Sequence, residues 1–307
     1  MEDLFYRKLI LTAPQEHIRL DEPMEYHTSL HIGGKADYFV TPTDVEEVKA
    51  VVCLCKSENV PYYIMGNGSN LLVSDLGYRG VVLQLGDEFQ KASVGEEGII
   101  TAQAGILLSR LANIAAEHSL TGFEFASGIP GTLGGAVTMN AGAYDGEMKQ
   151  CLIAARVMDV EGNVKELSLE ELNLGYRTSI LQKENYILLD AMIKLTKGDQ
   201  QLIRQKMNDL NAQRRDKQPL DKYSAGSTFK RPEGYFAGKL INDAGLRGYQ
   251  VGGAAVSEKH CGFVINKDNA TAEEFLALIR DVIRIVEEKF GVRLEPEVKF
   301  LGEGLKL

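Results

Sequence analysis

The chain has 307 residues, 44% hydrophobic and 25% charged, which is the composition of a globular protein large enough for two or three domains. A formal net charge of −9 and the lack of a dense Lys/Arg tract argue against nucleic acid as a partner. The sequence has no run of about 18 apolar residues, the length that spans a membrane. The first residues also lack the apolar stretch of a secretion signal. We therefore expect a cytoplasmic protein without a membrane span.

The first predicted elements form a small β-α-β unit. Residues 37–40 read as a strand, and Thr43-Asp-Val-Glu46 has the pattern of a capping box at the start of a helix over about 44–58. The apolar face of this helix carries Val48, Val51, Val52 and Cys55. A strand over 62–65 follows, and the small-residue turn Gly66-Asn-Gly-Ser-Asn70 stands at its end, where such units bind ligands.

The middle of the chain predicts mainly short strands, and the last third predicts two long helices. Strands are expected over 81–85, 99–102, 153–158 and 186–192, around one helix near 107–117. A polar helix over 199–216 carries the apolar stripe Leu202, Ile203, Met207 and Leu210. A second helix begins at the capping box Thr271-Ala-Glu-Glu274, carries Phe275, Ile279, Val282, Val286 and Phe290, and ends at Gly291. Residues 292–301 then read as a strand.

The cysteines and histidines predict neither disulfide bonds nor a metal site. Cys53, Cys55, Cys151 and Cys261 form no CxxC pair and are expected to be reduced packing residues. The five histidines form no dense ligand cluster. His260 and Cys261 are adjacent, but neighbouring side chains seldom point at each other, so a nucleophilic pair is disfavoured.

The most informative segment runs from Ser127 to Tyr144, with five glycines, one proline and no charge. Glycine lets a large ligand approach the backbone and leaves N–H groups to bind phosphate, although sharp turns in a β-rich core are the alternative explanation. The segment matches neither the dinucleotide fingerprint nor the P-loop, and the lookalike 234–240 lacks the spacing and hydroxyl of a P-loop. Together with the 66–70 turn, it predicts one large ligand with a pyrophosphate.

Six motifs in order resemble the MurB family, the UDP-N-acetylenolpyruvoylglucosamine reductases. They are Thr28–Lys35, Gly66–Asn70, Ser127–Tyr144, Tyr176-Arg-Thr-Ser179, Gly226-Ser-Thr-Phe-Lys-Arg-Pro232 and Glu295-Pro-Glu-Val-Lys-Phe300. The spacing between Arg177 and Ser227 looks more like the shorter of two subclasses, which lacks a tyrosine-bearing substrate loop. Any one motif is weak, but the set spans nearly the whole chain.

The resemblance implies an α+β fold with a flavin domain of the vanillyl-alcohol-oxidase or PCMH type in two subdomains, followed by a third α+β domain that binds substrate. We place the subdomains at 1–80 and 81–205, with the C-terminal strand 296–307 as a candidate addition to the first, and the substrate domain at 206–295. The implied cofactors are noncovalent FAD and NADPH as hydride donor. The implied partner is a small UDP-sugar, and the oligomeric state stays open.

The resemblance also implies the reaction, in which an enolpyruvyl ether is reduced to a lactyl ether for peptidoglycan synthesis. This is an oxidoreductase activity of cell-wall biogenesis, and thus of cell shape and division. Hydride addition to the terminal carbon pushes charge onto the α-carbon and carboxylate, which a guanidinium and a protonated carboxyl can stabilise. The family's motifs place Arg177 and Glu297 in these two roles, and Ser227 as the donor of the proton to the α-carbon.

The remaining predicted site residues follow from the same motifs. Candidates for FAD contact are the small and polar residues Gly66, Asn67, Gly68, Ser69, Asn70, Ser127, Gly128, Gly131, Gly134, Gly135 and Asn140. Candidates for substrate contact are Tyr176, Lys230 and Arg231. Lys230 could stabilise the Ser227 alkoxide or grip the pyrophosphate, and arginine stands at 231 where other members can carry asparagine.

Two other functions remain open at this stage. A different PCMH-type flavin oxidase, acting on an alcohol or sugar, would share the glycine loops but would not need the set Arg177, Ser227 and Glu297. A catalytically silent UDP-sugar or flavin sensor would need none of the three. The presence of all three residues favours the reductase.

Overall fold

The computed structural model describes residues 4–307, and the chain divides into two compact units. Unit 1 contains residues up to Leu20, Tyr38–Asn67 and Gly80–Gln213, and unit 2 contains Asp21–Asp37, Gly68–Arg79 and Arg214–Leu307. Within the described part of the chain, no helix is both long and apolar enough to cross a membrane. The three-domain division expected from the family stays a prediction.

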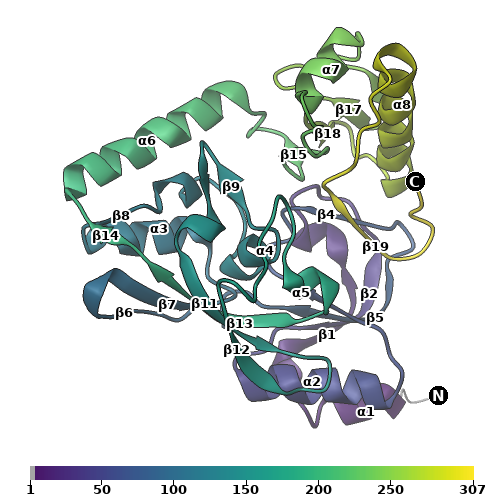
Figure 1. Cartoon of the computed structure of the whole chain (residues 1–307). Coiled ribbons are helices and arrows are strands. Elements are labelled where there is room, and N and C mark those ends of the chain that lie inside the picture. The colour runs from purple at the N-terminus through teal and green to yellow at the C-terminus, as the bar shows by residue number, and fades with distance from the viewer. Residues whose placement is uncertain (1–3) are drawn as a thin grey trace. The chain divides into compact units, whose positions relative to one another are not determined.

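Unit 1 is built on a five-stranded antiparallel sheet with strand order β12-β11-β13-β7-β6 (Figure 1). Its strands are β6 (Ala92–Val94), β7 (Ile99–Gln103), β11 (Leu152–Met158), β12 (Val164–Ser168) and β13 (Ile187–Lys194). Two strand pairs add to it, β8 (Leu120–Thr121) with β14 (Thr196–Lys197) and β9 (Gly142–Ala143) with β10 (Gly146–Glu147). The strands expected over 99–102, 153–158 and 186–192 are thus confirmed.

A second sheet has the order β1-β2-β5-β3, in which β3 and β5 run parallel. Its strands are β1 (Ile18–Pro23), β2 (Lys35–Val40), β3 (Tyr62–Met65) and β5 (Tyr78–Gln84). Tyr62 lies opposite Val81, which places the end of β3, and the turn that starts at Gly66, beside Gln84. Gln84 Nε2 donates to the Gly66 carbonyl at 3.1 Å and fixes the first residue of that turn.

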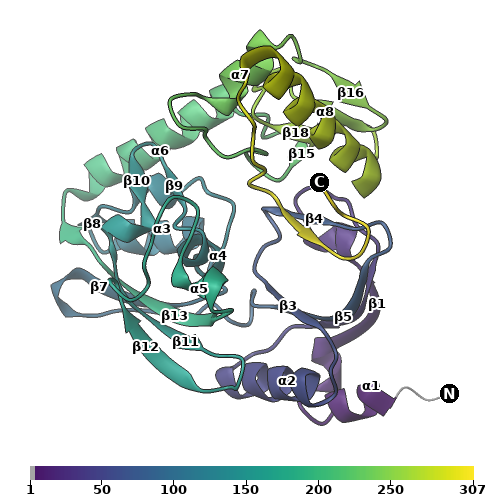
Figure 2. The same ribbon diagram turned by 45° about the vertical axis from the view of Figure 1, so that its right-hand side comes forward.

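The helices of unit 1 pack apolar side chains into its cores. They are α1 (Leu4–Leu9), α2 (Val45–Ser57), α3 (Leu108–Glu117), α4 (Leu133–Thr138) and α5 (Ile180–Lys183). In α2 all four predicted stripe residues are buried, and α1 lies beside this helix (Figure 2). Apolar side chains of α1 and α2, with Val81 and Leu83 of β5, form one small core.

The cap of α2 lies one residue later than expected. Asp44, not Thr43, is the N-cap, and its carboxylate accepts from the Glu47 amide at 2.9 Å. The Glu47 carboxylate returns to the Thr43 amide at 2.8 Å. The pattern Thr43-x-x-Glu46 overlaps with Asp44-x-x-Glu47 in the sequence. The second forms the cap, because aspartate is a stronger N-cap than threonine.

The polar helix α6 (Gln200–Lys217) buries less than its sequence suggests. Ile203 and Met207 are buried, but Leu202 is 65% exposed, so the predicted stripe is wrong at that residue. Leu202 and Ile203 are adjacent, about 100° apart on a helix, and only one of them can face the core.

Unit 2 combines a four-stranded antiparallel sheet of order β15-β18-β17-β16 with two helices. The strands are β15 (Tyr223–Ser224), β16 (Gln250–Val251), β17 (Ala254–Val256) and β18 (Val264–Asn266), and the helices are α7 (Ala237–Asp243) and α8 (Ala272–Phe290). Helix α8 packs on three of the strands and on α7 (Figure 1). A parallel pair, β4 (Leu71–Val73) with β19 (Lys299–Leu301), completes the unit.

The predicted ends of α8 are confirmed. Thr271 and Glu274 form the reciprocal capping box, and Gly291 ends the helix with φ +67°, a conformation that favours glycine. Phe275, Ile279, Val282 and Val286 are buried, whereas Phe290 is 39% exposed and does not belong to the core. Residues 292–298 are irregular, so the strand expected over 292–301 is confirmed only from Lys299 to Leu301.

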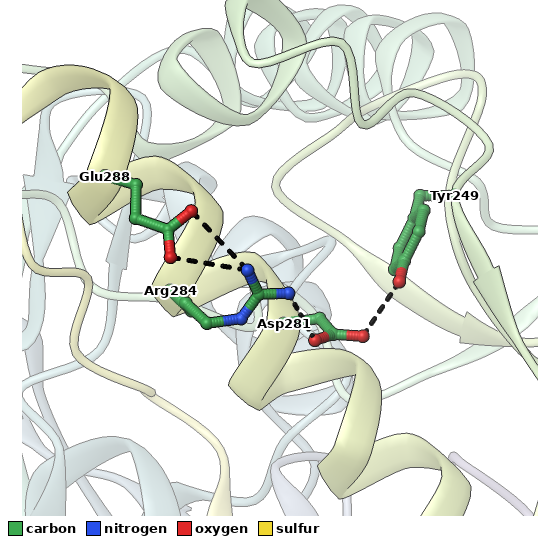
Figure 3. Close-up of polar contacts among 4 residues, drawn as sticks. All are labelled: Tyr249, Asp281, Arg284 and Glu288. Carbon is green, nitrogen blue, oxygen red and sulfur yellow. Dashed lines mark hydrogen bonds and ion pairs between the residues drawn. The ribbon is translucent and has the colours of Figure 1, made fainter.

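A polar network covers the outer side of α8 (Figure 3). The Tyr249 hydroxyl donates to Asp281 at 2.8 Å, and Asp281 accepts from Arg284 at 2.9 Å. Arg284 also lies 3.4 Å from Glu288, one turn further along the helix. The network attaches the turn before β16 to the helix that carries the core of unit 2.

The observed cap of α2 leads to a testable difference between two neighbouring residues. Asp44→Ala should destabilise the protein by about 1 kcal/mol, because the Glu47 amide loses its acceptor. Thr43→Ala should lower the free energy of unfolding clearly less, because the backbone N–H of residue 43 still donates to the Glu47 carboxylate. Urea titration followed by circular dichroism measures both values. Equal losses, or a larger loss for Thr43→Ala, would contradict the assignment of the cap.

Candidate active site

In unit 1, the start of the first glycine turn, Gly66–Asn67, packs directly against the glycine-rich segment. Asn67 Nδ2 donates to the Pro130 carbonyl at 2.8 Å. A Cβ added to Gly66 would lie 2.1 Å from Thr132 Oγ1, so the two backbones approach closely only because residue 66 is glycine. Gly66, Asn67 and Gly131 therefore belong to one small surface, as expected of residues that receive one ligand.

Ser127 opens the glycine-rich segment with a buried hydroxyl. The residue is 8% exposed, and its Oγ has no hydrogen-bond partner among the described residues. A buried hydroxyl without a partner is costly, and a polar ligand atom would satisfy it. Gly128 follows directly in the chain, so this end of the segment is suited to a polar ligand atom.

The segment is held in place by the buried Glu124. Its carboxylate accepts from Thr121 Oγ1 at 2.5 Å and from the Gly122 amide at 3.1 Å, and Lys206 lies 3.4 Å away. Burial alone would raise the pKa of Glu124, but these hydrogen bonds and the Lys206 charge together hold it below its ordinary value. The Ser127 amide donates to the Glu124 carbonyl at 3.2 Å, which connects the carboxylate to the start of the glycine segment.

The two glycines inside α4 have different surroundings. A Cβ on Gly134 would lie 3.2 Å from both Cβ and O of Ala104, so this glycine serves close packing. A Cβ on Gly135 would meet only Thr132 Oγ1 at 4.0 Å, an ordinary contact. Gly135 therefore leaves open space beside the helix, which suits its predicted role better than packing does.

The side-chain amide of Asn140 forms hydrogen bonds within the protein. Its Nδ2 donates to Glu147 and to the Gly175 carbonyl, both at 3.1 Å, and its Oδ1 accepts from the Lys149 amide at 2.9 Å. The side chain is 1% exposed. Asn140 thus connects the glycine segment to the turn that carries Arg177.

Arg177 stands at the tip of a tight turn. Gly175 and Thr178 pair with each other through both backbone groups, and Arg177 has φ +56°, the left-handed region that residues with a Cβ rarely adopt. Its guanidinium lies 5.0 Å from the ring of the half-exposed Tyr176. Such conformations persist only where surrounding contacts hold them, and they cluster at functional sites.

Contacts to the end of α4 hold this turn. Ser179 Oγ donates to the Thr138 carbonyl at 2.7 Å, and Gln182 Nε2 donates to the same oxygen at 2.8 Å. Gln182 Nε2 also donates to the carbonyl of Arg177 itself at 3.2 Å. The Tyr176–Ser179 motif is therefore part of the same assembly as the glycine-rich segment.

Unit 2 brings together three segments that are far apart in the sequence. The Glu297 amide donates to the Thr228 carbonyl, and the Lys230 amide donates to the Glu295 carbonyl, both at 2.8 Å. Asn70 Nδ2 donates to the Glu297 carbonyl at 3.1 Å, and the Lys299 amide donates to the Asn70 carbonyl at 3.0 Å. The Ser227 segment, the Glu297 segment and the end of the first glycine turn thus form one layer of paired backbone.

Buried neighbours anchor the exposed side chains of this layer. Thr228 and Phe229 are buried, and Thr228 Oγ1 accepts from the Val264 amide at 2.8 Å, while Ser227 is exposed and Glu297 is partly buried. Ser227 is therefore followed by two buried, fixed residues while it is itself exposed, which suits a proton donor to a ligand.

Positive charge gathers around the same layer. Lys230 Nζ lies 3.1 Å from Glu295, and Arg231 lies 4.0 Å over the Phe236 ring. Desolvation and the nearby Lys230 lower the pKa of Lys299, and Glu297 opposes this effect. Lys299 therefore lies close enough to Lys230 and Glu297 to respond to both charges.

Arg177 belongs to unit 1, whereas Ser227 and Glu297 belong to unit 2, so the meeting of all three stays a prediction. Thr132, Thr138 and Gln182, which contact the predicted site residues, were not expected from the sequence. Thr132 and Thr138 lie inside the glycine-rich segment and could have been suspected. Gln182 lies in an ordinary stretch of mixed composition and gives no signal.

The comparisons with known proteins agree on a flavin fold. Residues 36–168 match the model of the FAD-binding domain. The fold also resembles that of Phl p 4.0202, a glucose dehydrogenase, with a TM-score of 0.51 at 14% identity, covering 64% of this chain and 45% of that one. The class is therefore that of FAD-dependent oxidoreductases with the PCMH-type α+β fold, and that expectation is confirmed.

Full-length relatives define the family within this class. UDP-N-acetylenolpyruvoylglucosamine reductase of Lachnoclostridium phytofermentans is 56% identical over 306 residues, covering 99% of each chain, and that of Clostridioides difficile is 52% identical over 298 residues, covering 97% and 98%. The crystal structure of the enzyme from Thermus caldophilus aligns with a TM-score of 0.78 and 35% identity, covering 93% of this chain and all of that one. Residues 218–301 match the family's C-terminal domain. The chain belongs to the UDP-N-acetylenolpyruvoylglucosamine reductase family.

The Glu124 cluster predicts a pH dependence of stability. A carboxyl whose folded pKa is below its unfolded value stabilises the fold fully above the unfolded value, and this contribution disappears as pH falls through the folded pKa. In Glu124→Gln, the loss of unfolding free energy between pH 7 and about pH 4 should be smaller than in the parent. Urea titrations at both pH values measure it, with the exposed Glu117→Gln as control. Identical pH dependence in parent and Glu124→Gln would contradict the assignment.

Proposed function

We propose that the chain catalyses the NADPH-dependent reduction of UDP-N-acetylenolpyruvoylglucosamine to UDP-N-acetylmuramate, with Arg177, Ser227 and Glu297 as its catalytic residues. The observation that carries the assignment of roles is the backbone pairing of the Ser227 and Glu297 segments in unit 2. An oxidase or a binding sensor would not need a serine and a carboxylic acid held in register in this way.

Residues of both glycine turns would hold the cofactor. Three features fit a cofactor with a pyrophosphate. They are the Ser127 hydroxyl without a hydrogen-bond partner among the described residues, the open space beside Gly135 and the close contact between Gly66 and Thr132. Bound FAD would accept a hydride from NADPH and supply it to the terminal carbon of the enolpyruvyl group. No covalent attachment to the protein is needed for this role.

Arg177 and Glu297 would stabilise the charge that hydride addition creates. As the new C–H bond forms at the terminal carbon, the electron pair of the double bond moves onto the α-carbon and the carboxylate. The guanidinium of Arg177 offers two parallel N–H donors to that carboxylate, and a protonated Glu297 offers one O–H. Both interactions become stronger as the charge develops, which is the condition for lowering the barrier.

Ser227 would then complete the reaction by transferring its hydroxyl proton to the α-carbon. The resulting alkoxide must be stabilised and reprotonated from solvent, and the ammonium of Lys230, three residues further along the same paired segment, is the candidate for the stabilising charge. Because the Ser227 peptide is fixed beside Glu297, the proton would reach one face of the α-carbon only.

The UDP portion of the substrate would be bound by residues flanking these groups. Lys230 and Arg231 supply positive charge for the pyrophosphate, and Tyr176 supplies an exposed ring beside Arg177. The substrate and the NADPH donor are made inside the cell, so we place the enzyme in the cytoplasm.

Ser227→Ala separates the two half-reactions and tests the function as a whole. Flavin bleaching by NADPH should stay near the parental rate, while oxidation by the enolpyruvyl substrate should slow roughly 10²- to 10⁴-fold, because only the second step needs the serine proton. Anaerobic stopped-flow absorbance measures both, with Ser224→Ala as the matched control. Equal losses in both steps would assign Ser227 a structural role, and a parental enzyme that ignores the substrate but consumes dioxygen would favour the oxidase.

Glu297→Gln tests the carboxylic acid as a hydrogen-bond donor. Glutamine keeps a donor and should retain more activity than Glu297→Ala, while both variants should bind FAD as the parent does. Steady-state turnover at saturating NADPH and flavin content per chain measure the two quantities, with Glu303→Gln as the control on an exposed carboxylate. Parental turnover in both variants would exclude a catalytic role for Glu297.

A further inference from the structure

The carbonyl of Arg177 has a dedicated hydrogen-bond donor, and this contact is separate from those that hold the rest of the turn. Asn140 binds the Gly175 carbonyl, and Ser179 binds the Thr138 carbonyl. The Gln182 contact, at 3.2 Å, engages the carbonyl of Arg177 itself, while the N–H of the same peptide, that of Thr178, donates to the Gly175 carbonyl at 3.3 Å. The same Nε2 donates its other hydrogen to Thr138 at 2.8 Å, so Gln182 connects this peptide to the end of α4.

This connection matters because Arg177 is not a glycine. With φ +56°, its backbone is strained, and neighbouring contacts must offset that strain. If the carbonyl is released, the turn is left with the Gly175–Thr178 pair, and rotation at Arg177 toward a commoner φ becomes easier. That rotation changes the direction in which Cβ, and with it the guanidinium, leaves the backbone.

We propose that Gln182 is a positioning residue for Arg177, fixing the direction of the guanidinium toward the substrate carboxylate. The inference deepens the proposed function and rests on the role assigned there to Arg177. Gln182 touches no reacting atom in this scheme. It acts by holding one peptide plane, and bidentate binding of a carboxylate is sensitive to such orientation.

A purely structural role for Gln182 is the alternative, and the contacts distinguish the two. As a cap of α4, Gln182 would be redundant, since Ser179 Oγ already donates to the Thr138 carbonyl at 2.7 Å. Removal of the Gln182 amide should therefore leave α4 and the fold intact and disturb Arg177 alone.

A double-mutant cycle tests the proposal on the full-length, FAD-loaded enzyme. Gln182→Ala should weaken binding of the product, UDP-N-acetylmuramate, and slow oxidation of the reduced enzyme by substrate, each about tenfold. In the Arg177→Ala background, the same change should alter both quantities less than twofold. Calorimetric titration with the product gives a binding readout independent of turnover, and Gln150→Ala, which loses another glutamine-to-carbonyl contact in unit 1, is the matched control.

Two further variants guard against loss of folding. Gln182→Lys keeps a donor that can reach both carbonyls and should restore most of the product affinity, whereas Gln182→Glu offers only acceptors and should be at least as weak as Gln182→Ala. Circular dichroism and flavin content should match the parent in all of them.

The outcomes separate this proposal from the function it rests on. Parental product affinity in Gln182→Ala, with a clear loss in Arg177→Ala, would overturn the positioning role and leave the proposed function standing. Equal effects of Gln182→Ala in both backgrounds would show a structural role and overturn it as well. Parental behaviour of Arg177→Ala would overturn both the role of Arg177 and that of Gln182.

Discussion

The backbone pairing of Thr228 with Glu297 is the constraint on which the site in unit 2 depends. It joins positions 69 residues apart, and Asn70 adds a third distant segment by binding the Glu297 carbonyl. Pairing of their main chains brings these short motifs together, so in the proposed site the exposed serine and the partly buried carboxylate would need no long side chain to meet a common ligand. The parallel pairing of β4 with β19 continues the same arrangement away from the site.

In unit 1 the corresponding constraint is close approach, and it explains why small residues dominate the sequence there. Gly66 admits the Thr132 hydroxyl, Gly134 admits Ala104, and the turn of Arg177 lies on the end of α4 through shared carbonyls. The proposed role in the reaction requires an arginine at the tip of this turn, although glycine would adopt its backbone more easily. The hydrogen bonds around Gly175 and Thr138 reconcile these two demands.

Much of the fold was predictable because periodic burial and capping are local. The helices α2, α3 and α8 and the strands of the main sheet lie where their patterns place them, and the family motifs supplied the types of residues at the site. The errors have local causes too. Leu202 and Phe290 lie beside the buried stripe of their helices. The N-cap of α2 is Asp44 and not Thr43. The residues after Gly291 form no strand before Lys299. The contacts of Gln182 could not be predicted, because a hydrogen bond from a side chain to a distant carbonyl produces no periodic pattern and no unusual composition in the sequence.

The contact between Gly66 and Thr132 has a consequence for how this protein can vary. Any side chain at 66 would collide with the threonine hydroxyl 2.1 Å away, so a change at 66 is admissible only if residue 132 first becomes smaller. A smaller residue at 132, however, opens a void beside the turn that the larger residue at 66 would have to fill. The two positions should therefore covary, so that a sequence with a different residue at 66 also has a different residue at 132.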